Sequence, residues 1–175
     1  NEHTGAIDLA MDPTDPNTIF AAMYQRRRTS FGFSASGGGG GLYRSTDGGN
    51  SWEELTEGLP KGEKGRIGID VYRRDGNILY VTVEATEEEG GVFRSDDRGN
   101  SWRRVSTQNP RPMYFSLIRI DPNNPDRLYL GGTSLTASDD GGKTWTDADG
   151  DEVIHVDHHA LWIDPSNSQH VLVGN

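Results

Sequence analysis

The octapeptide Ser45-Thr-Asp-Gly-Gly-Asn-Ser-Trp52 decides the fold of this chain, because the sequence returns to it twice. It recurs as Ser95-Asp-Asp-Arg-Gly-Asn-Ser-Trp102 and again as Ser138-Asp-Asp-Gly-Gly-Lys-Thr-Trp145. The copies begin at residues 45, 95 and 138. Self-similarity at a period of roughly 40 to 50 residues indicates a repetitive architecture in which each unit packs on its neighbours.

The composition of the octapeptide suits a tight hairpin turn. Gly49, Gly99 and Gly142 can adopt a positive φ without steric cost, as such a turn requires. The Ser45 hydroxyl and the Asp47 carboxylate can accept hydrogen bonds from N–H groups of the turn. The tryptophan that ends each copy is then expected to pack back between sheets, where it would bury about 200 Å².

A second repeated element accompanies the octapeptide. Its copies are Leu9-Ala-Met-Asp-Pro13, Ile118-Arg-Ile-Asp-Pro122 and Leu161-Trp-Ile-Asp-Pro165, and Ile67-Gly-Ile-Asp-Val-Tyr72 takes this place in the second unit. Each copy leads into a further apolar run after a short polar stretch. A full unit therefore holds four short strands rich in Ile, Val, Leu, Tyr and Phe, separated by turns of Asn, Asp, Gly and Pro.

Four short strands in a unit of this length predict the blades of a β-propeller. We expect an all-β fold of four-stranded antiparallel blades, with about 3.5 blades in the 175 residues. The expected boundaries are about 5–58 for blade 1, 64–107 for blade 2, 113–149 for blade 3 and 157–175 for half blade 4. Such an array leaves strand edges unpaired, so we expect further blades from the same polypeptide or from another chain to complete the ring.

Composition argues against several classes of protein. Hydrophobic residues make up 32% of the chain and there are 23 glycines, which suits short strands and disfavours a helical bundle. The formal charge of −10 would repel nucleic acids and anionic membranes, since both are polyanions. The absence of cysteine excludes a disulfide framework, a zinc–thiolate site and a thiol nucleophile. The sequence predicts no membrane span, no signal peptide within it and no cofactor.

The three octapeptides match the Asp-box (bacterial neuraminidase) repeat, Ser-x-Asp-x-Gly-x-Thr-Trp, with Ser51 and Ser101 in place of threonine. The resemblance extends to sialidases, sortilin-type propellers and xyloglucanase-type glycoside hydrolases. The segments Pro110-Arg-Pro-Met-Tyr-Phe115 and His155-Val-Asp-His-His-Ala-Leu-Trp-Ile-Asp-Pro165 make the chain look closest to exported bacterial sortilin-like or glycosyl-hydrolase-like repeat proteins. This resemblance implies a propeller of seven or more blades and an extracellular or periplasmic location.

The resemblance also implies that the Asp box is a structural turn remote from any active site. Its aspartates are therefore not assigned a catalytic role. The residues that we assign to the structural turns are Ser45, Asp47, Gly49, Trp52, Ser95, Asp97, Gly99, Trp102, Ser138, Asp140, Gly142 and Trp145.

The alternation of strand directions divides the connections between two faces. The Asp boxes and the Asp-Pro turns share one face, which we call the Asp-box face. The long connections share the opposite side, the loop face, and long loops on a rigid scaffold are where binding and chemistry usually occur. These connections are Tyr24–Gly41, Glu57–Arg66, Glu84–Gly91, Ser106–Tyr114 and Asp147–His158.

The most specific ligand-binding candidates on the loop face are His155, Asp157, His158 and His159. In an extended segment, His155, Asp157 and His159 would turn to the same side. Two imidazoles and a carboxylate could then ligate Zn, Fe or Mn, or an Asp–His pair could act as base and orienting group. The alternative is that these side chains only hydrogen-bond neighbouring blades.

Two further pairs of loop residues are candidates for ligand binding. Arg26 and Arg28 begin the longest loop, before Phe31-Gly-Phe33, and could hold a carboxylate or stack on a sugar ring. A solvated loop is the alternative reading of that segment, because the glycine run that follows is flexible. Arg111 and Tyr114 could line a central pocket or pack a blade junction.

The sequence leaves open whether the protein is an enzyme. A glycosidase needs two carboxyl groups flanking a cleft, for which Asp8, Asp70 and Asp157 are weak candidates. No segment matches the arginine triad and nucleophilic tyrosine of sialidases, so sialidase activity is disfavoured. We favour an exported propeller that binds a polypeptide or polysaccharide through its loop face and central channel. The alternatives are a glycoside hydrolase acting on xyloglucan or β-glucan, with its catalytic carboxylates partly outside this segment, and a structural interaction module.

Overall fold

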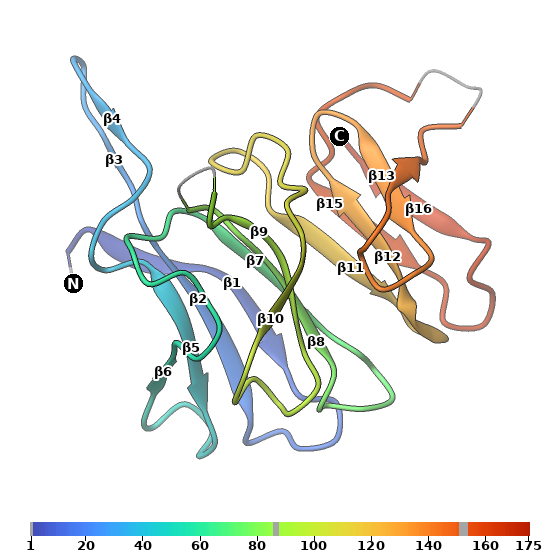
Figure 1. Ribbon diagram of the computed structural model, residues 1–175, viewed down its shortest axis with the longest axis horizontal. Coiled ribbons are helices and arrows are strands. Elements are labelled where there is room, and N and C mark those ends of the chain that lie inside the picture. The colour runs from blue at the N-terminus through green and yellow to red at the C-terminus, as the bar shows by residue number, and fades with distance from the viewer. Residues whose placement is uncertain (1, 86–87, 151–153) are drawn as a thin grey trace.

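The computed structural model describes residues 2–85, 88–150 and 154–175, and every regular element in these ranges is a β-strand. Three four-stranded antiparallel sheets and one two-stranded sheet follow one another along the chain (Figure 1). Within the described ranges, no helix has the length and apolar character needed to cross a membrane. The structure therefore confirms an all-β fold made of propeller blades.

Each full blade is an antiparallel meander, and an additional short hairpin is inserted in the first. Blade 1 contains β1 (Thr4–Met11), β2 (Ile19–Gln25), β5 (Gly41–Ser45) and β6 (Glu53–Leu55). Blade 2 contains β7 (Ile67–Val71), β8 (Leu79–Val83), β9 (Gly91–Ser95) and β10 (Arg103–Ser106). Blade 3 contains β11 (Leu117–Asp121), β12 (Asn124–Gly131), β13 (Leu135–Ser138) and β14 (Thr146–Asp147). Half blade 4 contains β15 (Ala160–Ile163) and β16 (Val171–Gly174), and the inserted hairpin pairs β3 (Arg27–Arg28) with β4 (Phe33–Ser34).

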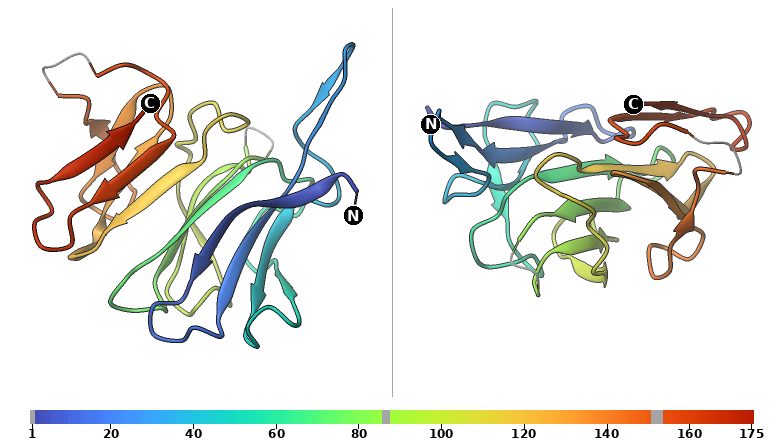
Figure 2. Two further views of the ribbon diagram at one scale, coloured as in Figure 1. Left: turned by 180° about the vertical axis from the view of Figure 1, so that it is seen from behind. Right: turned by 90° about the horizontal axis from the view of Figure 1, so that it is seen from above.

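The blades stand next to one another in chain order, as Figures 1 and 2 show. The first strand of each blade contacts the first strand of the next, from β1 to β7, β11 and β15. We call these four the inner strands. Because all of them run from the loop face to the Asp-box face, their starts gather at one end of the array and their ends at the other.

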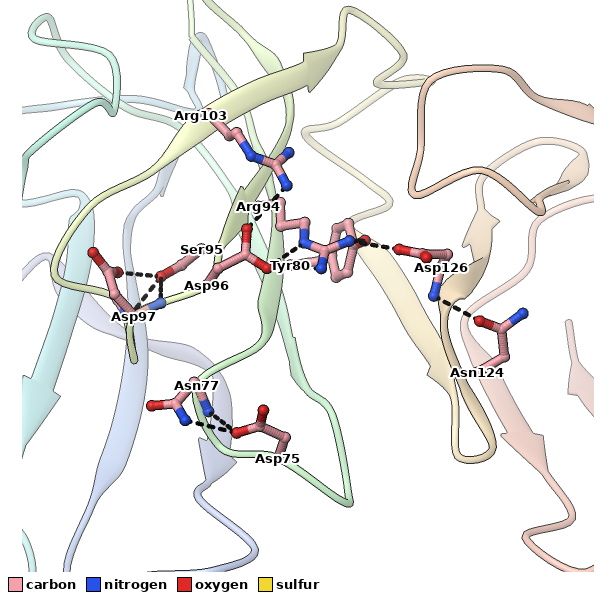
Figure 3. Close-up of polar contacts among 11 residues, drawn as sticks. Asp75, Asn77, Tyr80, Arg94, Ser95, Asp96, Asp97, Arg103, Asn124 and Asp126 are labelled. Atoms are coloured by element: carbon pink, nitrogen blue, oxygen red, sulfur yellow. Dashed lines mark hydrogen bonds and ion pairs between the residues drawn. The ribbon is translucent and has the colours of Figure 1, made fainter.

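The Asp box of blade 2 shows how the octapeptide closes its turn (Figure 3). The Ser95 hydroxyl accepts the Gly99 amide at 2.8 Å and donates to Asp97 Oδ1 at 2.7 Å. Asp97 in turn accepts the amide and the hydroxyl of Ser101, at 2.9 and 2.6 Å. Gly99 has a φ of 83°, in the left-handed region that glycine tolerates. In blade 1 the hydroxyl of Ser51, with further donors, lowers the pKa of Asp47 to about 2.

The Asp-box tryptophans of blades 2 and 3 pack on the blade before their own. Trp102 of blade 2 is only 6% exposed and belongs to one cluster with Phe20 and Leu55 of blade 1. Trp145 of blade 3 packs in the same way against the cluster that joins blades 2 and 3. Trp52 of blade 1 has no such partner among the described residues and remains 43% exposed. Trp102 and Trp145 therefore hold adjacent blades together.

The second strand of each blade supplies the opposite contact. Phe20, Tyr80 and Tyr129 each join a buried cluster with residues of the following blade. In half blade 4, Leu172 of β16 is 67% exposed, while Val171 and Val173 pack on blade 3. The junctions between blades 1 and 2 and between blades 2 and 3 thus combine a side chain that points forward along the array with an Asp-box tryptophan that points back.

Polar contacts on the Asp-box face cross the same junctions (Figure 3). Arg94 of β9 donates from Nη1 to the Tyr80 hydroxyl at 2.7 Å and to Asp126 Oδ1 of blade 3 at 2.6 Å. The carboxylate of Asp12, 1% exposed, forms an ion pair with Arg98 Nε of blade 2 at 3.0 Å. These side chains make contacts between neighbouring blades.

We predict that Trp102→Ala destabilises the chain by about 3–5 kcal/mol, because it removes a buried side chain and leaves a cavity. In this 175-residue segment, the matched change Trp52→Ala should cost about 1 kcal/mol or less, since 43% of that residue is exposed. Urea unfolding of both variants, followed by circular dichroism, measures the difference. Equal losses would contradict the inter-blade packing described above.

Candidate functional site

The starts of the inner strands form a polar hollow of about 140 Å³ on the loop face, which we call the channel mouth. Its polar lining comes from every blade. The lining side chains with polar groups are Asp8, Arg66, Ser116, Arg119, His158 and His159.

Arg66 directly precedes β7 and brings a guanidinium group to the channel mouth. Its Nη1 donates to the Tyr114 carbonyl at 2.8 Å, which ties blade 2 to the loop before β11. Its Nε is buried and has no hydrogen-bond partner. Its backbone amide donates to Glu84 Oε2 at 2.7 Å, and burial raises the pKa of that carboxyl. The Arg66 Nε–H group is therefore available to donate a hydrogen bond to a ligand.

His158 is the most enclosed polar side chain of the site, with 1% of its surface exposed. Its amide donates to the Gly132 carbonyl at 2.9 Å, which fixes the backbone against blade 3. Its Nε2 lies 3.3 Å from Asp149 Oδ1, but neither ring nitrogen makes a hydrogen bond. The neighbouring His159 is exposed, and its ring lies 5.0 Å from that of Phe115.

A larger hollow of about 520 Å³ continues from the channel mouth along the inner strands, and both hollows share Asp8 and Arg119. Two of the candidate catalytic carboxylates line this hollow, and each accepts a hydrogen bond from a backbone amide of the next inner strand. Asp8 Oδ2 accepts the Ile69 amide at 3.1 Å, and Asp70 Oδ2 accepts the Ile120 amide at 2.7 Å. Burial raises the pKa of Asp70 to about 6. These carboxylates therefore have a structural use that requires no catalysis.

The structure separates the candidates of the 155–159 segment. His158 and His159 reach the channel mouth, whereas His155 is exposed and places Nδ1 2.9 Å from the Val156 carbonyl. Asp157 has a φ of 77°, so the segment is not extended and the expected alternation of side chains is wrong. Among the residues that the structure describes, no three His, Cys, Asp or Glu side chains gather in a group that could hold a metal ion.

The remaining candidates lie in two places. Arg111 and Tyr114 are exposed in the loop before β11, with the guanidinium 4.8 Å from the ring centroid, next to the Tyr114 carbonyl that accepts Arg66. Arg26 and Arg28 lie at the β3–β4 hairpin, away from the channel mouth. Within this long connection, residues 27–28 and 33–34 pair as two short strands, which the sequence analysis did not predict.

Sequence reasoning missed Arg66 and Arg119 as site residues. Both are ordinary arginines in the sequence, and only the side-by-side packing of inner strands brings them to His158. One signal was available: Arg66 precedes the first strand of its blade, as His158 and His159 precede β15. Comparing that position across the repeats would have found it.

Asp70 should make the folded protein less stable as the pH rises from about 4 to about 7. Its folded-state pKa, about 6, lies above the ordinary value of 3.8, so the stability it contributes below pH 3.8 is lost as pH rises through 6. Asp70→Asn cannot ionise and should remove up to about 3 kcal/mol of this pH dependence. Urea unfolding of both proteins at pH 4 and pH 7 measures it. The same change with pH in both proteins would refute the assignment.

Comparison with known proteins gives the same architecture. The chain resembles a GH74 enzyme of Niastella koreensis, with a TM-score of 0.65 and 19% identity over 93% of this chain and 25% of that one. It resembles the GH74 xyloglucanase of Xanthomonas campestris, with a TM-score of 0.59 and 22% identity over 85% of this chain and 24% of that one. YCF48 bound to D1 peptide is similar with a TM-score of 0.56 and 18% identity, over 83% of this chain and 40% of that one.

The chain thus spans about a quarter of the length of these GH74 enzymes. None of the curated proteins matches it. The model of the Sortilin-Vps10 family, described as "Sortilin, neurotensin receptor 3", matches residues 40–151. Because this match covers more than half of the 175 residues and the structure has the blades and Asp boxes of such a propeller, the chain belongs to the Sortilin-Vps10 family.

Proposed function

We propose that this chain is part of an exported β-propeller, extracellular or periplasmic, that binds a polypeptide or polysaccharide through its loop face and central channel. The ligand enters at the channel mouth and presents an acidic group to it. The remaining blades come from the same polypeptide or from another chain, and they leave the mouth open.

The observation that carries the proposal is the gathering of Arg66, Arg119, His158 and His159 around one hollow of about 140 Å³. Arg66 Nε and both ring nitrogens of His158 are buried without hydrogen bonds. Leaving such a group unsatisfied costs about 1–3 kcal/mol. A ligand oxygen can accept a hydrogen bond from Arg66 Nε and from the His158 ring nitrogen that carries the proton. A carboxylate suits the site, because it accepts bonds from guanidinium and imidazole groups alike.

The location of the hollow also supports binding. The inner strands hold the mouth residues on a rigid sheet array, and the neighbouring loops supply variable contacts. YCF48, a protein of similar fold, has been solved with a peptide bound. This precedent supports a peptide as one class of ligand for the proposed site.

A glycoside hydrolase is the second candidate function. Two observations favour it: GH74 enzymes share the fold, and Asp70, with a pKa raised to about 6, borders the larger hollow beside Asp8. A carboxyl with such a pKa could act as a general acid. Against it, Asp8 and Asp70 already accept backbone amides of the next blade.

Calorimetric titration of the full-length protein with unfolded peptides, xyloglucan, β-glucan and sialyl oligosaccharides tests the proposal. We predict saturable binding without cleaved products, weakened about tenfold or more by Arg119→Gln, since a charge-assisted hydrogen bond is worth about 1.5–3 kcal/mol. Lys143→Gln, which removes one positive charge from the Asp-box face, should leave the affinity unchanged. Product formation that disappears in Asp70→Asn would establish the hydrolase instead, and equal effects of Arg119→Gln and Lys143→Gln would place binding elsewhere.

A further inference from the structure

A hairpin arm, residues 25–36, projects from the loop face beside blade 1 (Figures 1 and 2). Its strands β3 and β4 pair Arg27 with Ser34 and Arg28 with Phe33. The tip is a closed turn, in which the Thr29 amide donates to the Gly32 carbonyl at 2.8 Å. The arm is therefore a formed element with a defined tip.

The base of the arm is attached to the body of the molecule. The Gln25 side chain accepts the Gly39 amide at 2.9 Å, and Gly37 forms a β-bridge with Lys64 of the loop before blade 2. A two-stranded hairpin alone is marginally stable in water, so these anchors contribute to its order. They involve only the base, and the tip makes no contribution to the packed core.

The arm differs from the rest of the chain in charge and in exposed apolar surface. Arg26, Arg27 and Arg28 are consecutive, and residues 25–36 contain no Asp or Glu, although the whole chain carries a net charge of −10. Phe31 at the tip is 102% exposed and Phe33 is 45% exposed. Arg26 covers one side of the Phe33 ring, with its guanidinium carbon 5.4 Å from the centroid. Exposed aromatics beside arginines are the residue types enriched at protein interfaces.

We propose that the arm is a docking element for an acidic polypeptide segment. Phe31 enters an apolar pocket of the partner, and the arginines pair with the carboxylates around that pocket. The free edges of the two-stranded sheet can also accept an extended partner segment as a further strand. This surface is separate from the channel mouth, and the inference does not rest on the function proposed for that site.

Charge favours a polypeptide over an anionic membrane. A bilayer is broad and flat, so it would also approach the acidic residues of the same face, among them Glu84, Glu88 and Glu89, and the net charge of −10 would oppose it. A polypeptide segment is small enough to contact the arm alone.

The side chains of the arm also disfavour a polysaccharide. Recognition of sugar hydroxyls relies on carboxylate and amide acceptors beside an aromatic face. The only side-chain amide in the arm is that of Gln25, and its oxygen already accepts a hydrogen bond from the Gly39 backbone amide. The arm contains no carboxylate. Guanidinium groups beside exposed phenylalanines instead suit carboxylates that stand next to apolar side chains.

Titration with a random copolymer of glutamate and tyrosine tests the proposal, with polyglutamate, phosphatidylserine vesicles and alginate as comparison probes. We expect the copolymer to bind more tightly than polyglutamate. Phe31→Ser should weaken copolymer binding about tenfold, and replacing Arg26, Arg27 and Arg28 together by glutamine should remove most of its salt dependence. Because the arm tip lies outside the core, these variants should keep the unfolding midpoint of the parent protein.

Lys143→Gln, which removes one positive charge from the Asp-box face, serves as the control that should leave binding unchanged. Absence of copolymer binding, equal binding by the Phe31→Ser variant, or equal arm-dependent binding of vesicles or alginate overturns the proposal. Arg119→Gln separates the two sites: copolymer binding that depends on the arm and survives this change supports the arm whether or not the channel mouth functions as proposed.

Discussion

The burial of an Asp-box tryptophan against the preceding blade holds this array of sheets together. Trp102 fills the space between blades 1 and 2, and Trp145 does the same between blades 2 and 3. Each indole is held by its own box, since the Trp102 Nε1 donates to the Gly99 carbonyl at 3.1 Å. A turn within one blade therefore determines how that blade packs on another. The exposed Trp52 and Leu172 are the surfaces where the same packing could continue with further blades.

The packing of blades also forms the hollow that we propose as the ligand site. Because the inner strands lie side by side and run in the same direction, the residues at their starts converge even when they are far apart in the sequence. Arg66 and His158 meet in this way at the channel mouth. On the opposite face, polar side chains join neighbouring blades: Asp12 forms an ion pair with Arg98, and Asp126 accepts a hydrogen bond from Arg94. The proposal therefore assigns ligand binding to the loop-face end of the array and a structural role to the Asp-box end.

The sequence was sufficient to predict the repeating fold, because each octapeptide specifies a local turn. The distance along the chain between successive octapeptides fits the four strands of one blade. It was only partly sufficient for the site. The His158–His159 pair stands out in the sequence, but Arg66 and Arg119 become site residues only through contacts between blades, which a local pattern does not encode. The expected alternation of His155 and Asp157 was wrong because Asp157 adopts a positive φ. The arm was taken for a loop because its strands are only two residues long.

Hydrogen exchange of the full-length protein, with and without the ligand from the titration panel that binds, tests the division between binding end and structural end most directly. The account predicts that amides at the starts of β7, β11 and β15 become protected when the ligand binds. Amides of the three Asp boxes should exchange at the same rates in both samples. Protection at the Asp boxes, or its absence at the starts of the inner strands, would contradict the account.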